Sequence, residues 1–94
     1  MYPIHPGEHL KEFLDELGIS QNAFALSIGV SAMRISLVVK GKRPVTAELA
    51  VLFGKAFSQT PQFWMNLQTS YELKIAQKNL SQRLKQVQPL ALAA

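Results

Sequence analysis

The sequence of 94 residues contains no cysteine, and no apolar run in it approaches the length of a membrane span. Without cysteine the chain forms neither disulfides nor thiolate metal sites, which is typical of cytosolic proteins. The first residues, 1–5, have neither the basic nor the apolar segment of an export signal. Charged residues make up only 17%, against 48% apolar residues, so we expect a folded chain. The sequence therefore predicts one small, soluble, cytoplasmic domain spanning residues 1–94.

Acidic residues are also missing from residues 17–47, although this stretch contains four basic residues. The basic residues are Arg34, Lys40, Lys42 and Arg43. The first helical region has the opposite balance. It contains one basic residue, Lys11, and four acidic residues, Glu8, Glu12, Asp15 and Glu16. This layout suggests separate faces for separate partners, although charges that only keep an exposed face solvated would give the same pattern at the acidic end.

Residues suited to catalysis or metal binding are not grouped in the sequence. His5 and His9 are four positions apart, but a Pro-Gly pair separates them and no third ligand lies nearby. We therefore expect these histidines at the surface or at a helix cap. No Ser/His/Asp or Cys/His arrangement occurs, and there is no glycine-rich phosphate loop. The sequence thus predicts no enzyme, no metal, no cofactor and no small-molecule effector.

Helix caps and apolar periodicity divide the chain into five expected helices. The first should run from residue 6 or 7 to 17, where Gly18 ends it. Ser20, Ser31 and Thr46 are good N-caps for helices at about 21–28, at about 32–40 and from residue 47. Thr60 before a proline predicts a long fifth helix reaching about residue 84. The residues expected in the core of the first and fourth helices are Leu10, Phe13, Leu14, Leu17, Leu49, Leu52, Phe53 and Ala56.

Residues 21–31 have the pattern of two helices joined by a tight turn. Ala25 is small enough for two helices to approach closely, and Gly29 can adopt the positive φ that the turn needs. Apolar residues stand where such a pair is buried, at Phe24, Ile28, Val30, Ile35 and Val38. The stretch resembles the helix-turn-helix domains of the phage-repressor type, with the motif at 20–41. That resemblance implies an all-α, five-helix, lambda repressor-like domain with its core at about 6–76 and a long C-terminal helix and tail at 61–94.

In such a domain the second helix of the motif lies in the major groove of DNA, and flanking residues contact phosphates. Ser31 and Ser36 can hydrogen-bond to several bases, whereas the apolar side chains of this helix can only contact thymine methyl groups. Arg34 has three open roles, which are contact with a phosphate, recognition of guanine, and pairing with a carboxylate. The expected DNA contacts are Gln21, Ser31, Ala32, Met33, Arg34, Ser36, Leu37, Lys40, Lys42 and Arg43.

The fifth helix carries more apolar residues than one small domain needs. We therefore expect it to form the interface of a homodimer, although the same residues would also serve to complete the core of one chain. The residues expected at this interface are Phe63, Trp64, Leu67, Tyr71 and Ile75.

Two further segments narrow the resemblance. Residues 4–8, Ile-His-Pro-Gly-Glu, precede the first helix, and residues 60–68, Thr-Pro-Gln-Phe-Trp-Met-Asn-Leu-Gln, open the fifth. Together with the motif they resemble the HigA-type antitoxins, which are relatives of virulence-associated protein I. The resemblance implies a bacterial type II toxin–antitoxin pair. Its antitoxin would neutralise a RelE-like mRNA endonuclease by direct binding, and would repress its own operon by binding an inverted repeat in the promoter as a dimer.

A toxin that binds RNA must be basic, so the acidic residues of the first helix are its expected contacts. They are Glu8, Glu12, Asp15 and Glu16. This face is expected to lie away from the cationic one, so that toxin and DNA bind at once. Two alternatives stay open. One is a stand-alone phage-type repressor without a toxin, and the other is a protein-interaction module whose DNA binding has decayed.

Overall fold

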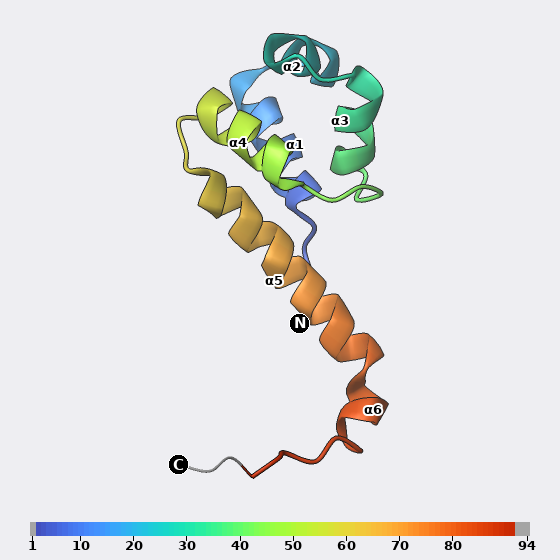
Figure 1. Ribbon diagram of the computed structural model, residues 1–94. Coiled ribbons are helices and arrows are strands. Elements are labelled where there is room, and N and C mark those ends of the chain that lie inside the picture. The colour runs from blue at the N-terminus through green and yellow to red at the C-terminus, as the bar shows by residue number, and fades with distance from the viewer. Residues whose placement is uncertain (1, 92–94) are drawn as a thin grey trace.

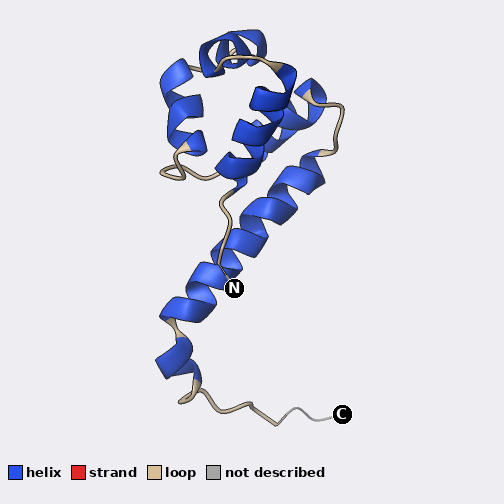
Figure 2. Cartoon of the chain, turned by 180° about the vertical axis from the view of Figure 1, so that it is seen from behind, coloured by secondary structure: helices blue, strands red, loops and turns tan. Residues whose placement is uncertain are grey.

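The computed structural model describes residues 2–91 and contains six α-helices and no strand within that range. Four short helices form a globular cluster, comprising α1 (Pro6–Leu17), α2 (Gln21–Ile28), α3 (Ala32–Val39) and α4 (Ala47–Ala56). The long α5 (Pro61–Asn79) packs against this cluster by its first half and then projects from it, and the short α6 (Ser81–Leu84) follows (Figure 1). The same arrangement is visible from behind in Figure 2. No helix among the described residues is long and apolar enough to cross a membrane.

The helices begin where the sequence predicts, because their caps are local. The side-chain oxygens of Ser20, Ser31, Thr46 and Thr60 each accept a hydrogen bond from the backbone N–H three residues later, at 3.0–3.3 Å. Gly18 ends α1 in the left-handed conformation, with φ 67°. The one departure is that the expected fifth helix breaks at Leu80. Beyond the cluster α5 buries no residue, so packing does not hold a single helix through that point.

The core forms where α1, α2, α3, α4 and the first half of α5 meet. Its side chains are Leu10, Leu14, Phe24, Ala25, Ile35, Val38, Val45, Leu49, Ala50, Phe53 and Trp64. The predictions for Leu17 and Ala56 are wrong. Leu17 is 58% exposed because α1 ends there, past the edge of the core, and on α4 it is Ala50 rather than the exposed Ala56 that is buried. The predicted Phe13 and Leu52 are partly buried against the core.

Two polar contacts fix α5 on the cluster, and the sequence does not reveal either. Gln68 is 3% exposed, and its Oε1 accepts a hydrogen bond from the backbone N–H of Val45 at 2.8 Å. The indole N–H of Trp64 donates to Oε1 of Gln59 at 2.9 Å. Because a buried amide without a partner is costly, the bond of Gln68 holds α5 against the segment that leads from α3 to α4, and the bond of Trp64 holds it against the turn between α4 and α5.

Candidate nucleic-acid interface

The turn between α2 and α3 has the geometry that the sequence predicts. Gly29 adopts φ 72°, and the N–H of Val30 donates to the carbonyl of Ala25 at 3.0 Å. Ile35 and Val38 on α3 are completely buried, which fixes the rotation of this helix about its own axis. The opposite side of α3 therefore faces outward, as the second helix of a helix-turn-helix must in order to enter a groove.

The outward side of α3 is short of polar groups. Ser31, Ala32 and Met33 are exposed, with Met33 at 73%, whereas Ser36 and Leu37 are half-buried. A shallow hollow of about 240 Å³ lies on this side. Its lining residues are Ser31, Met33, Arg34, Leu37 and Arg43. The structure thus brings residues of the helix together with one residue of the basic loop that follows it.

The basic loop, residues 40–43, folds back against the end of α3. The backbone N–H groups of Lys42 and Arg43 both donate to the carbonyl of Leu37, at 2.9 and 3.3 Å. Lys40, Lys42 and Arg43 are all exposed. Gln21 is half-buried at the first position of α2. The loop therefore presents three cations beside the outward side of α3, where no carboxylate occurs on either α2 or α3.

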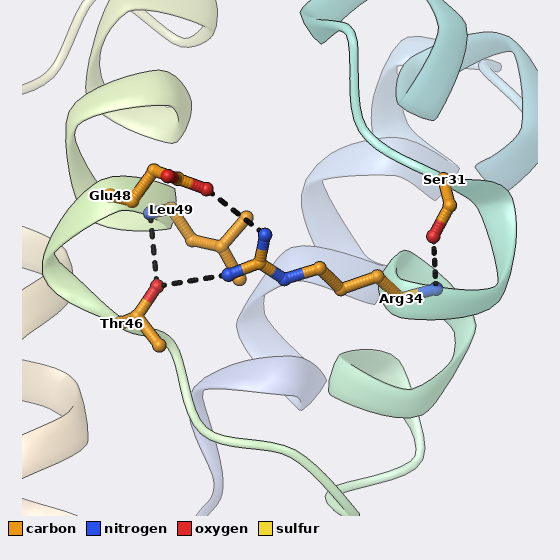
Figure 3. A network of polar contacts seen from close by, with 5 residues as sticks. All are labelled: Ser31, Arg34, Thr46, Glu48 and Leu49. Carbon is orange, nitrogen blue, oxygen red and sulfur yellow. Dashed lines mark hydrogen bonds and ion pairs between the residues drawn. The ribbon is translucent and has the colours of Figure 1, made fainter.

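Arg34 has a carboxylate partner, which is one of the three roles that the sequence leaves open. Its Nη1 lies 3.0 Å from Oε1 of Glu48, and its Nη2 donates to the hydroxyl of Thr46 at 3.3 Å (Figure 3). The same hydroxyl accepts from the N–H of Leu49 and so caps α4. The guanidinium thus points from α3 toward the start of α4.

His5 connects the basic loop to two helices, a role that the sequence shows only in part. Its Nδ1 caps α1 by accepting from the N–H of Gly7 at 2.9 Å, which confirms the expectation of a capping histidine. The ring is only 7% exposed, meets the ring of Tyr71 on α5 edge-on at 4.9 Å, and hydrogen-bonds to the backbone of Arg43. Burial lowers the pKa of His5, although the bond to Arg43 and the charge of Glu8 act in the opposite direction. Among the described residues no group of His, Asp or Glu has the geometry to hold a metal ion.

Comparisons with known proteins agree with this geometry. The helix-turn-helix family matches residues 10–64. Virulence-associated protein I of Dichelobacter nodosus is 40% identical over 84% of this chain and 74% of its own length. Antitoxin HigA-1 of Vibrio cholerae is 35% identical, over 94% of this chain and 84% of its own. Among solved structures, the Pseudomonas aeruginosa antitoxin HigA with the higBA promoter superposes on this chain with a TM-score of 0.91. The two sequences are 39% identical, and the match covers 96% of this chain and all of that one. The chain belongs to the HigA-type antitoxin family of helix-turn-helix proteins. That family is not enzymatic, which agrees with the prediction from the sequence, where residues suited to catalysis are not grouped.

The predicted dimer residues of this HigA-type chain face mainly inward. Trp64 is 0% exposed and lies edge-on against Phe53 at 5.1 Å, so its side chain has no surface left for a second chain. Leu67 is partly buried against the core, Tyr71 is half-buried on His5, and Ile75 is half-buried. Phe63 is 37% exposed. Leu73, further along α5, is more exposed, at 55%.

The predicted toxin-contact residues are all exposed along α1. Asp15 lies 2.9 Å from Nζ of Lys11, so a neighbouring cation already offsets its charge. Glu8 lines one hollow together with Lys40 and Gly41 of the basic loop. The expectation that the acidic face lies away from the cationic one therefore fails at Glu8, because the N-terminus of α1 packs beside the C-terminus of α3.

Proposed function

We propose that this chain represses its own promoter by binding an inverted repeat as a dimer, and that it neutralises a RelE-like mRNA endonuclease toxin by direct contact. The observation that carries the DNA part is the outward side of α3, a helix that contains no carboxylate of its own and is flanked by Lys40, Lys42 and Arg43. A duplex carries one negative charge for about every 1.7 Å of its axis, so a surface of this kind attracts it. The similar Pseudomonas aeruginosa antitoxin has been solved with the higBA promoter, which supports the same partner for this chain.

The basic loop is proposed to contact phosphates rather than bases. Lys42 and Arg43 are exposed side chains on a backbone that two hydrogen bonds to Leu37 hold beside α3. Contacts of this kind fix the position of the protein on the duplex and supply salt-dependent affinity, without specifying a sequence.

The dimer is proposed to form through the part of α5 that projects from the cluster. Leu73 and Ala76 of α5 and Leu80, the residue that caps its C-terminus, follow the spacing i, i+3, i+7, and all three are exposed. This stripe gives a second chain an apolar surface that the core of the first does not use. Two linked domains would then present two α3 helices to the two half-sites of an inverted repeat.

A titration of the promoter DNA of this chain tests the proposal. Affinity would be measured at several salt concentrations for the wild type and for Lys42→Ala/Arg43→Ala. The matched control is Lys78→Ala/Lys85→Ala, which removes two basic residues from the C-terminal part of the chain. We expect the wild type to bind the promoter more tightly than random DNA, and the salt slope of the loop variant to fall by ~1 for each phosphate contact that the substitutions remove.

The control variant should retain both affinity and slope. An equal loss in the two variants would mean that only net charge matters and that the basic loop is not the contact. Wild-type binding to the promoter no tighter than to random DNA would leave a protein-interaction module as the function of this chain.

A further inference from the structure

We propose that α3 recognises its operator through the C5-methyl groups of thymines, which Met33 and Leu37 contact in the major groove. This inference rests on the proposed function, because it names the chemical groups that the same surface would bind.

The first argument is the placement of the apolar side chains. Met33 and Leu37 are one helical turn apart on the outward side of α3, and both line the hollow of about 240 Å³. Met33 is 73% exposed on a helix whose other side already fills the core with Ile35 and Val38. Its side chain is therefore not needed for folding. An unbranched thioether can adapt to a methyl group, and in the major groove only thymine presents one.

The second argument is that the guanidinium of Arg34 and the hydroxyl oxygen of Ser31 are engaged elsewhere. Arg34 is the one residue of the helix able to form two parallel hydrogen bonds to guanine, and its guanidinium is held by Glu48 and Thr46. The hydroxyl oxygen of Ser31 accepts the N–H of Arg34 at 3.2 Å as the helix cap, which leaves its proton as the group free for a base. Direct recognition by α3 then depends mainly on apolar contact.

The third argument identifies DNA as the occupant of the hollow. Arg43 is exposed and forms part of its lining, and exposed Lys42 precedes it in the basic loop. A methyl group bound between Met33 and Leu37 would belong to a base whose backbone lies near these cations. An apolar protein segment would gain nothing from them, whereas a thymine-bearing strand satisfies both parts of the site.

The experiment compares promoter DNA that contains thymine with the same DNA in which deoxyuridine replaces every thymidine. This replacement removes the C5-methyl groups and keeps the Watson–Crick pairing and the phosphates. We expect the wild type to bind the uracil DNA less tightly, by roughly fourfold for each methyl group that Met33 or Leu37 would otherwise cover. Lys42→Ala/Arg43→Ala should weaken binding to both DNAs equally and keep the ratio between them.

The variant Met33→Ala/Leu37→Ala should bind the two DNAs with the same affinity, since it lacks the side chains that sense the methyl group. Met33→Ala alone should reduce the ratio of the affinity for thymine DNA to the affinity for uracil DNA. This single variant keeps the half-buried Leu37, so it still tests the inference if the double variant does not fold. Equal wild-type affinity for the two DNAs would overturn the inference while leaving the proposed function intact. A ratio that persists unchanged in both variants would also overturn it, because the methyl effect would then act through DNA shape. Wild-type binding to neither DNA above the level of random DNA would overturn both proposals.

Discussion

Arg34 links α3 to the start of α4 through one guanidinium group. Its partners Glu48 and Thr46 lie at 3.0 and 3.3 Å, and the side chains of the ion pair are 37% and 69% exposed. An ion pair with this exposure contributes only about 0.2–1 kcal/mol to stability. The significance of the contact is therefore geometric, because it ties α3, whose rotation the buried Ile35 and Val38 fix, to the start of α4.

A glutamine at position 34 distinguishes this positioning role from a phosphate contact. We expect Arg34→Gln to weaken binding to promoter DNA without changing the dependence of affinity on salt, since the guanidinium already has a carboxylate partner. The comparison variant is Lys42→Gln, which should lower the salt slope by ~1 because it can no longer pair with a phosphate. The measurement is the affinity of each variant at four or more salt concentrations. A drop in slope for Arg34→Gln equal to that for Lys42→Gln would show that Arg34 leaves Glu48 on binding.

His5 makes the stability of the chain dependent on pH. Burial lowers the pKa of its imidazole in the folded protein below 6.5, the value expected for the unfolded chain, and the nearby groups are Glu8 and the ring of Tyr71. Between the two pKa values the unfolded chain binds more protons. The free energy of unfolding therefore has its full value above about pH 6.5, where His5 is neutral in both states, and it falls as the pH decreases below that value. Protonation also removes the lone pair that caps α1 at Gly7.

Urea unfolding at pH 7.5 and pH 5.5 measures this effect. We expect the wild type to be less stable at pH 5.5. His5→Gln should be less stable than the wild type at pH 7.5 but should change less between the two pH values. His9→Gln is the matched control, because it removes a histidine from the same helix away from the cap. A pH effect in His5→Gln as large as that of the wild type would contradict the assignment.

The beginnings of α1 to α5 and the ends of α1, α2 and α3 were predictable from the sequence, since each depends on a few neighbouring residues, whereas the end of α5 at Asn79 was not. Ser31, for example, caps α3 by a bond to a residue three positions away, and Gly29 shapes the turn by its own φ. The outward side of α3 was predictable for the same reason, because its rotation follows from the apolar spacing of Ile35 and Val38. Local chemistry thus accounts for the motif and for most of the candidate site.

Burial in α5 was not predictable, because it depends on packing between distant segments. Trp64 and Gln68 are both buried, the first against Phe53 and the second against the backbone of Val45. Nothing in the sequence distinguishes Gln68 from the exposed glutamines around it. The sequence also did not identify the carboxylate partner of Arg34, since Glu48 lies 14 positions further along the chain.

The exposed stripe on α5 gives a direct test of the dimer. We expect the wild type to have twice the mass of one chain in solution, and Leu73→Glu/Leu80→Glu to be a folded monomer with weaker promoter binding, because its two domains are no longer linked. Analytical ultracentrifugation measures the mass. The matched control is Leu26→Glu, which places the same charge on an exposed leucine of α2, 84% exposed, and should remain dimeric. A dimer that persists in the α5 double variant would move the interface elsewhere.

Across the whole molecule, the acidic and basic surfaces are adjacent at one end and separate at the other. Glu8 shares a hollow with Lys40, whereas Glu12 and Glu16 lie one and two helical turns further along α1. A basic toxin seated on the far part of α1 would leave the outward side of α3 open, but one that extended over Glu8 would reach the basic loop. If the proposed toxin binds α1, its position along the helix would decide whether DNA and toxin compete.

Charge reversal on α1 measures that position. Glu12→Lys/Glu16→Lys is chosen because Asp15 is already paired with Lys11, and because a lysine at position 16, in the last turn of α1, interacts favourably with the helix dipole. We expect this variant to bind the proposed toxin roughly tenfold more weakly than the wild type, since reversed charges repel a basic partner. Glu12→Gln/Glu16→Gln should give a smaller loss. Promoter affinity in the absence of toxin should change in neither variant, which also serves as the folding control.

Unchanged toxin affinity in both variants would exclude the far part of α1 as the contact. A toxin that binds normally and releases the DNA would instead point to Glu8 and the neighbouring basic loop, where one partner must displace the other.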